Sequence, residues 1–284
     1  MKTGETIEYL RQRKNISLTA ICGTEISRQN YYRISHDQVN TSITKFRFIL
    51  EKLNVTFDEF YFIKENFNQE KIFLDYTKAQ NEFENKNIQA LTNMIKEYAA
   101  IKNNSTRELH LYCLLVILKK KLQHKSDETC EQILHDYLIR IETWTHYETV
   151  LFNNCMFIFS TDFINVVIFK TLSNLSAYSS LRSYGSESFR MLVNVLILSI
   201  DRHEWTTATS VLQKMRQITL ADDLVFEHAC LRFFNNLLAF IQGETTDTSH
   251  YEEVIQALKF LGSNKLALIF TTYLKESTNQ LTHI

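Results

Sequence analysis

The absence of proline constrains the fold of this chain more than any other feature of its sequence. None of the 284 residues is proline, where average usage would supply roughly 14, and only five are glycine. These are the two residue types that most readily end or kink a helix. Apolar residues also recur at three- and four-residue spacing along nearly the whole chain, whereas the alternation typical of strands is scarce. We therefore predict an all-α fold.

The segment from Ile26 to Ile34 predicts a short, capped helix with one apolar and one basic face. Ser27 is a good N-cap, because its hydroxyl can accept a hydrogen bond from an otherwise unpaired N–H group of the first turn. Tyr31 and Ile34, three residues apart, can then face inward, with Ile26 packed beneath the cap.

The opposite face of this helix carries groups that can read DNA. An Arg side chain can pair with guanine O6 and N7, and a Gln side chain with adenine N6 and N7, each in a two-bond fork. Arg28 and Gln29 are therefore candidates for base contacts. For these nine residues alone, an ordinary surface helix with a few cations is the competing interpretation. The residues expected at the DNA are Ser27, Arg28, Gln29, Asn30, Tyr32 and Arg33.

Four more short helices surround this one and favour the DNA-reading interpretation. The last is the clearest, because Thr56 and Glu59 form a capping box between the hydrophobic staple positions Val55 and Phe60. Five short helices, the third one basic, make a helix-turn-helix domain of the repressor type, which we assign to residues 1–66. This arrangement resembles the N-terminal domain of the Xre-like (Xre-type) regulators. In the first helix the apolar stripe is Ile7 and Leu10. In the second, Ser17 is the cap, Leu18 and Ile21 form the stripe, and Gly23 lies near the end. In the fourth, Thr41 or Ser42 is the cap, and the stripe is Ile43, Phe46, Ile49, Leu50 and Leu53.

The distribution of charge suits contact with a polyanion at one end only. Residues 1–52 hold nine Lys and Arg against five Asp and Glu, a net charge of +4, and the rest of the chain carries −5. A single domain with this charge attracts DNA too weakly to hold it tightly by itself. We therefore expect a homodimer on double-stranded DNA, with a palindromic or two-half-site operator whose halves lie roughly one helical turn apart. The expected phosphate contacts are Arg11, Arg13, Lys14 and Lys45.

Several classes of protein do not fit the sequence. No apolar run approaches the ~20 residues that cross a bilayer, and no apolar signal core follows Met1 and Lys2. Phosphate loops, zinc-protease motifs and nucleophile elbows are missing. The five cysteines form no C-x-x-C pair, which indicates reduced, mostly buried thiols, with a regulatory dimer disulfide as the minor alternative. We expect a cytoplasmic protein that is not an enzyme and needs no metal or cofactor.

From residue 67 onward the sequence predicts a series of amphipathic helices. Their starts lie roughly 18 to 20 residues apart, so a pair of helices spans close to the length of a tetratricopeptide-like (TPR-like) unit. We assign residues 67–284 to a TPR-like helical-repeat domain, an α-solenoid that binds a peptide and supports dimerisation. Its paired helices are expected to stack in a right-handed sense around a concave inner face. Predicted helices include 144–159, 162–176, 186–200 and 222–241, and Ser126 is the predicted cap of an earlier one.

Asparagines on otherwise apolar helices suggest a ligand for that inner face. Asn194 is the clearest, because it lies within the apolar run from Met191 to Ile197. A buried amide without a partner costs roughly 1–3 kcal/mol, so each of these amides must bond to something. Helix ends or water inside the stack are one set of partners, and the backbone of an extended peptide is another. The candidate peptide contacts of this kind are Asn153, Asn154, Asn194 and Asn235.

Two motifs give the chain a family resemblance. The first runs from Ser27-Arg28 through Leu53-Asn54-Val55 to Glu59-Phe60, and the second is Trp144-x-x-Tyr147-Glu148-x-x-Leu151-Phe152-Asn153-Asn154. With these motifs, the chain resembles the Rgg/GadR/MutR family of Gram-positive transcription regulators. The resemblance implies a sequence-specific regulator controlled by a short, apolar, secreted peptide that re-enters the cell, which is a form of quorum sensing. The alternative is a protein-interaction adaptor with a vestigial helix-turn-helix and no peptide ligand.

The resemblance makes the segment between Tyr178 and Glu187 a candidate part of the peptide site. It can form a wall of a peptide pocket, with Arg182 on a C-terminal carboxylate, or it can be a solvated Ser-rich linker. His146 can meet Tyr178, Tyr184 or Glu187 across such a pocket and make affinity depend on pH, or it can lie on a helix surface. The further candidate peptide contacts are His146, Tyr178, Arg182, Tyr184, Glu187 and Arg232.

Overall fold

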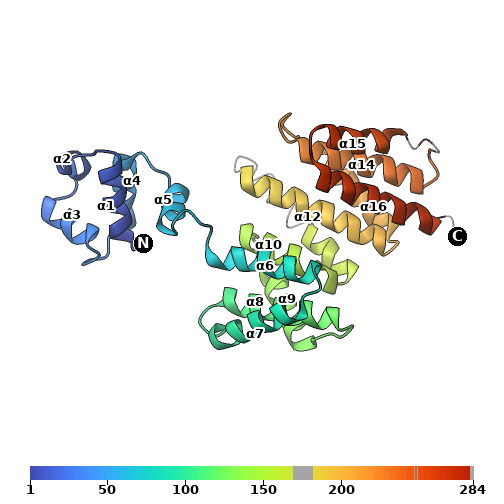
Figure 1. Cartoon of the computed structure of the whole chain (residues 1–284), viewed down its shortest axis with the longest axis horizontal. Coiled ribbons are helices and arrows are strands. Elements are labelled where there is room, and N and C mark those ends of the chain that lie inside the picture. The colour runs from blue at the N-terminus through green and yellow to red at the C-terminus, as the bar shows by residue number, and fades with distance from the viewer. Residues whose placement is uncertain (169–181, 246, 248, 282–284) are drawn as a thin grey trace. The chain divides into compact units, whose positions relative to one another are not determined.

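The computed structural model describes residues 1–168, 182–245, 247 and 249–281, with 182–186 and 276–281 described by their backbone alone (Figure 1). Every regular element in these ranges is an α-helix, apart from one short 3-10 helix. The predicted all-α fold is therefore confirmed. Contacts divide the chain into two compact units, Met1–Gln123 and His124–Ile284.

Unit 1 begins with five short helices where the sequence predicts five. They are α1 (Thr3–Arg13), α2 (Leu18–Cys22), α3 (Arg28–Ser35), α4 (Ile43–Leu53) and α5 (Phe57–Lys64). We call these five helices the head. They share one buried core, formed by Ile7, Leu10, Ile21, Cys22, Ile26, Tyr31, Ile34, Phe46, Ile49, Leu50, Leu53 and Phe60.

Two residues of the predicted stripes do not reach that core. Leu18 is 45 % exposed and Ile43 is 70 % exposed. Each is the first residue of its helix, directly after a serine cap, and so lies beyond the part of the helix that packs inward. The stripe prediction was wrong at these two ends and correct along the helix interiors.

Serine and threonine caps set the starts of four head helices. The side chains of Ser17, Ser27, Ser42 and Thr56 each accept a hydrogen bond from the backbone N–H three residues later. Ser42 rather than Thr41 is therefore the cap of α4. Thr56 also forms the predicted capping box, because Glu59 accepts a bond from the Thr56 N–H at 2.8 Å. Local sequence alone accounts for these helix boundaries.

Helices α1 and α3 approach each other closely at Gly4. A Cβ atom at this position would lie 2.2 Å from the carbonyl oxygen of Ile34, a backbone atom that cannot swing away. The Gly4 N–H also donates to Asp37 Oδ1 at 2.8 Å, just beyond the end of α3. Glycine at this position therefore sets how near α3 lies to α1.

Replacing Gly4 with alanine should destabilise the head, although the same change in an exposed helix normally stabilises by up to ~1 kcal/mol. Overpacking at the crossing is expected to cost about 1–3 kcal/mol. The measurement is thermal unfolding followed by circular dichroism, compared with the wild-type chain. A higher melting temperature for Gly4→Ala would show that the crossing is looser than a distance of 2.2 Å implies.

A single carboxylate also joins these two helices. Glu8 accepts hydrogen bonds from Arg11 Nε and Nη2 at 2.9 and 2.6 Å, from Gln12 Nε2 at 2.8 Å and from the Tyr31 hydroxyl at 2.9 Å. The Arg11 hydrogen bond is the largest influence on the pKa of Glu8, and together with the other donors it outweighs burial and lowers that pKa to about 2. Burial and the bond to Glu8 raise the pKa of Tyr31 in turn.

This pKa shift makes the stability of the head depend on pH. The folded-state pKa of Glu8 lies below its usual value of 4.5, so the stabilisation is present above about pH 5 and is lost as the pH falls toward 2. Glu8→Gln should therefore reduce the free energy of unfolding by about 1–2 kcal/mol at pH 7, since water partly screens this carboxylate, and by much less at pH 2. Amide hydrogen exchange in α1 and α3, compared at equal pH, measures this difference. An equal loss at both pH values would contradict the assignment.

Three longer helices complete unit 1. They are α6 (Lys71–Glu84), α7 (Ile88–Ile101) and α8 (Thr106–Leu122), and all three pack on one another. The contacts thus group the first repeat helices with the head. The domain boundary predicted between residues 66 and 67 falls in the loop before α6, and it stays a prediction.

Unit 2 is a succession of helices in which neighbours along the chain pack together. Helix α12 packs on α10 and α13, α13 on α14, α14 on α15, and α15 on α16. Sequential packing of this kind is what a helical-repeat fold requires. The elements are α9 (Glu128–Arg140), α10 (His146–Cys155), η1 (Met156–Ile158), a helical stretch at 161–168, α12 (Arg182–Asp201), α13 (Trp205–Arg216), α14 (Val225–Ile241), α15 (Ser249–Phe260) and α16 (Asn264–Leu281).

Predicted boundaries of two helices in unit 2 were wrong for local reasons. The cap of α9 is Asp127, not Ser126, because Asp127 Oδ1 accepts the Cys130 N–H at 3.1 Å. The predicted helix 144–159 begins at His146, after a capping box of Thr145 and Glu148, and ends at Cys155. Beyond it the chain turns through η1.

The predicted start of the helix over 186–200 was also wrong. Helix α12 begins at Arg182, so residues 182–187 are helical and do not form a linker. Gly185 costs such a helix only about 1 kcal/mol. The long apolar stretch that follows, from Met191 to Ile200, supplies the packing that offsets this cost.

Candidate functional site

The structure brings the predicted DNA-reading residues together on α3. Tyr31 and Ile34 are 2 % and 3 % exposed, as expected for the inner face. The side chains of Arg28, Gln29, Tyr32 and Arg33 are exposed on the outer face, whereas Asn30 is half-buried. Ser27 accepts a hydrogen bond from the Asn30 N–H at 3.2 Å, which confirms it as the cap. The two predicted faces of this helix are confirmed.

Two further residues contact the outer face of α3, and neither is among those predicted. Arg28 Nη2 donates to Thr19 Oγ1 of α2 at 2.9 Å. The rings of Tyr32 and His36 stack with centroids 4.0 Å apart, and His36 Nδ1 lies 2.8 Å from the Tyr32 carbonyl oxygen. The four-residue spacing of Tyr32 and His36 is a signal in the sequence for that stack, but no sequence spacing reveals the bond from α3 to α2.

The four cations expected to contact phosphate differ in how they are held. Arg13, Lys14 and Lys45 are exposed. Lys14 Nζ donates to the Asn54 carbonyl at 3.0 Å, which still leaves two of its three N–H donors. Arg11 is only 17 % exposed, and its guanidinium binds Glu8 and the Ile16 carbonyl inside the head. This geometry argues against Arg11 as a phosphate contact, and the other three cations remain candidates.

The candidate asparagines of unit 2 have different partners. Asn194 Nδ2 of α12 donates to Asn153 Oδ1 of α10 at 3.3 Å, so two candidates from separate helices meet. Asn154 Nδ2 instead donates to the Val150 carbonyl of its own helix at 2.8 Å. Asn235 Oδ1 of α14 accepts a bond from Arg216 of α13 at 2.6 Å. All four candidate asparagines therefore have a hydrogen-bond partner within the protein.

The structure describes the side chains of only some of the remaining candidate peptide contacts. Arg232 of α14 forms an exposed ion pair with Glu253 of α15 at 3.4 Å. His146 is half-buried in the first turn of α10, and Glu187 is half-buried on α12. Tyr178 and the side chains of Arg182 and Tyr184 lie outside the described residues. The predicted approach of His146 to this group is therefore a hypothesis still.

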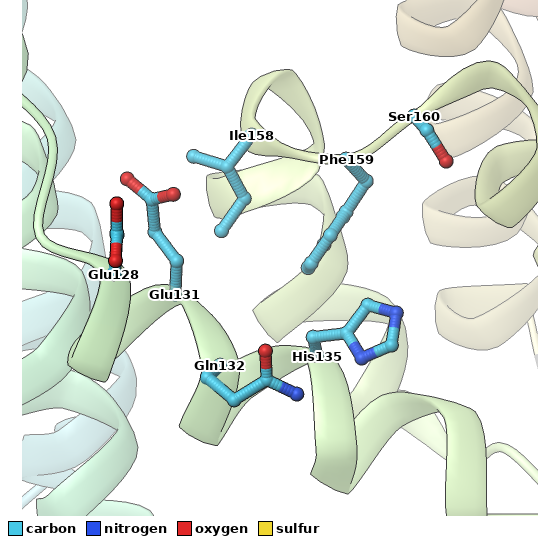
Figure 2. A pocket seen from close by; sticks show the side chains of 7 residues that line it. All are labelled: Glu128, Glu131, Gln132, His135, Ile158, Phe159 and Ser160. Carbon is cyan, nitrogen blue, oxygen red and sulfur yellow. The ribbon is translucent and has the colours of Figure 1, made fainter.

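Three hollows lie on the described part of unit 2, and two of them contain charged side chains. Figure 2 shows the first, of about 310 Å³, where Glu128, Glu131, Gln132 and His135 of α9 face Ile158, Phe159 and Ser160. The second, of about 350 Å³, lies between α14 and α15 and has the Arg232–Glu253 pair among mostly apolar residues. Both are near the lower limit of small-molecule pockets, and Arg232 is the one predicted contact that lines either of them.

The described ranges contain neither a metal site nor a helix suited to span a membrane. These residues contain no cluster of three or more His, Cys, Asp or Glu side chains that could hold a metal ion. All five cysteines are buried and none of them forms a disulfide, and burial raises the pKa of Cys230 to about 12. Among the described helices, none combines the length and apolar character needed to cross a membrane.

Comparisons with solved structures find close matches in fold. A Listeria monocytogenes EGD-e protein described as a candidate transcriptional regulator has a TM-score of 0.85 at 17 % identity, with 99 % of this chain and 98 % of that chain covered. The Streptococcus dysgalactiae SHP pheromone receptor Rgg2 has a TM-score of 0.78 at 19 % identity, covering 97 % and 99 %. At these identities the likeness shows the fold alone.

Two further comparisons reach the level of family. RopB is 39 % identical over 79 % of this chain and 100 % of its own, with a TM-score of 0.65. Residues 69–272 match the family model of the C-terminal domain of the HTH-type transcriptional regulator Rgg. That match spans well over half of the sequence, and the chain therefore belongs to the Rgg family of transcription regulators.

Proposed function

We propose that this Rgg-family regulator works in the cytoplasm, binds DNA as a homodimer through α3, and is controlled by a short apolar peptide held by unit 2. The observation that carries the DNA proposal is the exposed outer face of α3. Arg28 presents forked donors there and Gln29 an amide with one donor and one acceptor group, while Tyr31 and Ile34 anchor the inner face. A rigid helix with this division is what direct reading of base edges requires.

The contacts divide into base reading and phosphate binding. Arg28 and Gln29, in the first turn of α3, are the proposed base readers, because the first residues of a recognition helix point into the major groove. Arg13, Lys14 and Lys45 lie exposed near the ends of α1 and α4 and are the proposed phosphate contacts. Phosphate contacts fix the position of the protein but carry no sequence information.

A homodimer follows from the charge of the head. Residues 1–52 carry only +4, and each phosphate neutralised contributes little affinity at physiological salt. Two heads on one duplex combine their affinities, because the second binds at a high effective concentration once the first is bound. The operator should then contain two related half-sites.

Replacing Arg28 with alanine should weaken binding to the selected operator by about 1–3 kcal/mol and remove the preference at one base pair of each half-site. The measurement is selection of bound duplexes from a random pool, followed by fluorescence anisotropy. Lys96→Ala is the matched control, because Lys96 is an exposed cation on α7, outside the head. A variant Arg28→Ala with an unchanged sequence preference would refute α3 as the reader.

The peptide proposal rests on family membership and on one pair of amides. An asparagine side chain offers two N–H donors and two acceptor lone pairs. The bond between Asn194 and Asn153 uses one donor and one acceptor, so the exposed Asn194 carbonyl and the second N–H groups remain for a ligand. These are the groups that pair with the backbone of an extended peptide. The Rgg2 relative is named as a pheromone receptor, which supports the same ligand class here.

Peptide control requires that the ligand distinguish two arrangements of the dimer. A peptide with equal affinity for both would shift nothing, however tightly it bound. We therefore propose that the bound peptide favours one relative placement of the two heads, and with it one set of operators or one transcriptional output.

Removing the Asn194 amide should weaken peptide binding and leave DNA binding without peptide unchanged. The peptide is purified from the cells' own spent medium and labelled with a fluorophore. We expect Asn194→Ala to weaken its binding free energy by about 1–2 kcal/mol, and so to raise its Kd. Asn93→Ala is the matched control, because Asn93 is an exposed amide on α7. Equal affinity of the two variants and the wild type would exclude Asn194 from the peptide site.

A further inference from the structure

The exposed bond between α2 and α3 points to a residue that acts through Arg28. Arg28 is the first residue of α3, and its Nη2 donates to the hydroxyl of Thr19 on α2 at 2.9 Å. We propose that Thr19 is a positioning residue, which holds the Arg28 guanidinium in the orientation that reads a base. This proposal rests on the proposed function, in which Arg28 contacts a base pair.

The arginine keeps enough donors to read a base while it is held. A guanidinium has five N–H donors in one plane, and the bond to Thr19 occupies one of them. In the described part of the chain, Thr19 is the one hydrogen-bond acceptor found for Arg28. The second N–H of Nη2 and those of Nη1 and Nε therefore remain for the two-bond fork to guanine O6 and N7.

The hydroxyl of Thr19 has a well-defined position, because α2 is anchored on both sides of it. Ser17 caps the helix by accepting the Ala20 N–H at 3.1 Å. The Gly23 N–H donates to the Thr19 carbonyl at 3.1 Å, which closes the last turn. Ile21 is fully buried in the core of the head. The hydroxyl is thus carried by a rigid element rather than by a loop.

Holding the arginine before DNA arrives lowers the cost of binding. A long, exposed side chain loses rotamer freedom when it is immobilised at an interface, and a partner on the protein removes part of that loss in advance. The gain appears only where the ordered guanidinium meets its base pair. Thr19 should therefore affect sequence discrimination at that base pair and leave the sequence-independent affinity for phosphate unchanged.

The test compares full-length Thr19→Val, Thr19→Ser and Arg28→Ala with the wild type. Valine keeps the shape of threonine and removes the hydroxyl, whereas serine keeps the hydroxyl. Selection of bound duplexes should show that Thr19→Val reduces discrimination at the base pair read by Arg28 by roughly two- to tenfold. Affinity for random DNA and its salt dependence should not change, and Thr19→Ser should keep most of the discrimination.

A double substitution separates positioning from an independent contact. If Thr19 acts through Arg28, Thr19→Val should cause no further loss of discrimination in the Arg28→Ala background. Thr19 is exposed, so its variants should fold, and thermal unfolding checks this. Thr19→Ala replaces the valine variant if that protein is unstable.

The outcomes distinguish the inference from the function on which it rests. If Arg28→Ala leaves every base preference intact, base reading by Arg28 fails and the role of Thr19 fails with it. If Arg28→Ala removes a preference but Thr19→Val does not, only the role of Thr19 is overturned. A uniform loss of affinity on all sequences for Thr19→Val would make Thr19 a phosphate contact and would also overturn the proposal.

Discussion

Glu8 accepts hydrogen bonds from Arg11, Gln12 and the Tyr31 hydroxyl, so one carboxylate connects α1 to the helix that we propose reads DNA. The same two helices meet at Gly4, where the space between them admits no side chain. Together the short distance and the charged network fix how α3 lies on the head. Base reading needs this placement to be rigid. Only then do the outer face of α3, the bond to Thr19 and the exposed cations of the head keep fixed positions relative to one another.

The head could be predicted well because its signals are local. Caps such as Ser27 and Thr56 act on N–H groups three residues away, and the inner stripe of α3 has helical spacing. The role of Arg11 could not be predicted in this way. Its position beside Lys14 suggested a surface cation, but the chain folds so that Glu8 and the Ile16 carbonyl take up its guanidinium. The partner of Arg28 on α2 likewise exists only after the two helices pack.

In unit 2, the sequence named candidate asparagines but could not name their partners. All four candidate asparagines have partners in the protein. Asn154 and Asn235 bond to other residues, and Asn153 and Asn194 from separate helices bond to each other. Whether an amide has a protein partner depends on which helices are adjacent, and helical periodicity does not specify adjacency. The start of α12 at Arg182 also depends on packing that the local sequence does not specify. A single glycine and several serines did not prevent a helix there.

The proposed function requires one protein to read DNA through its head and a secreted signal through unit 2. A genome-wide map of the DNA bound in cells, grown with and without their own spent medium, tests this most directly. We predict discrete sites with two related half-sites, and occupancy or transcription at those sites that changes with the medium. Discrete sites without any such change would contradict control by a secreted peptide. An absence of discrete sites in both conditions would contradict DNA reading itself and would favour an adaptor that acts through protein partners.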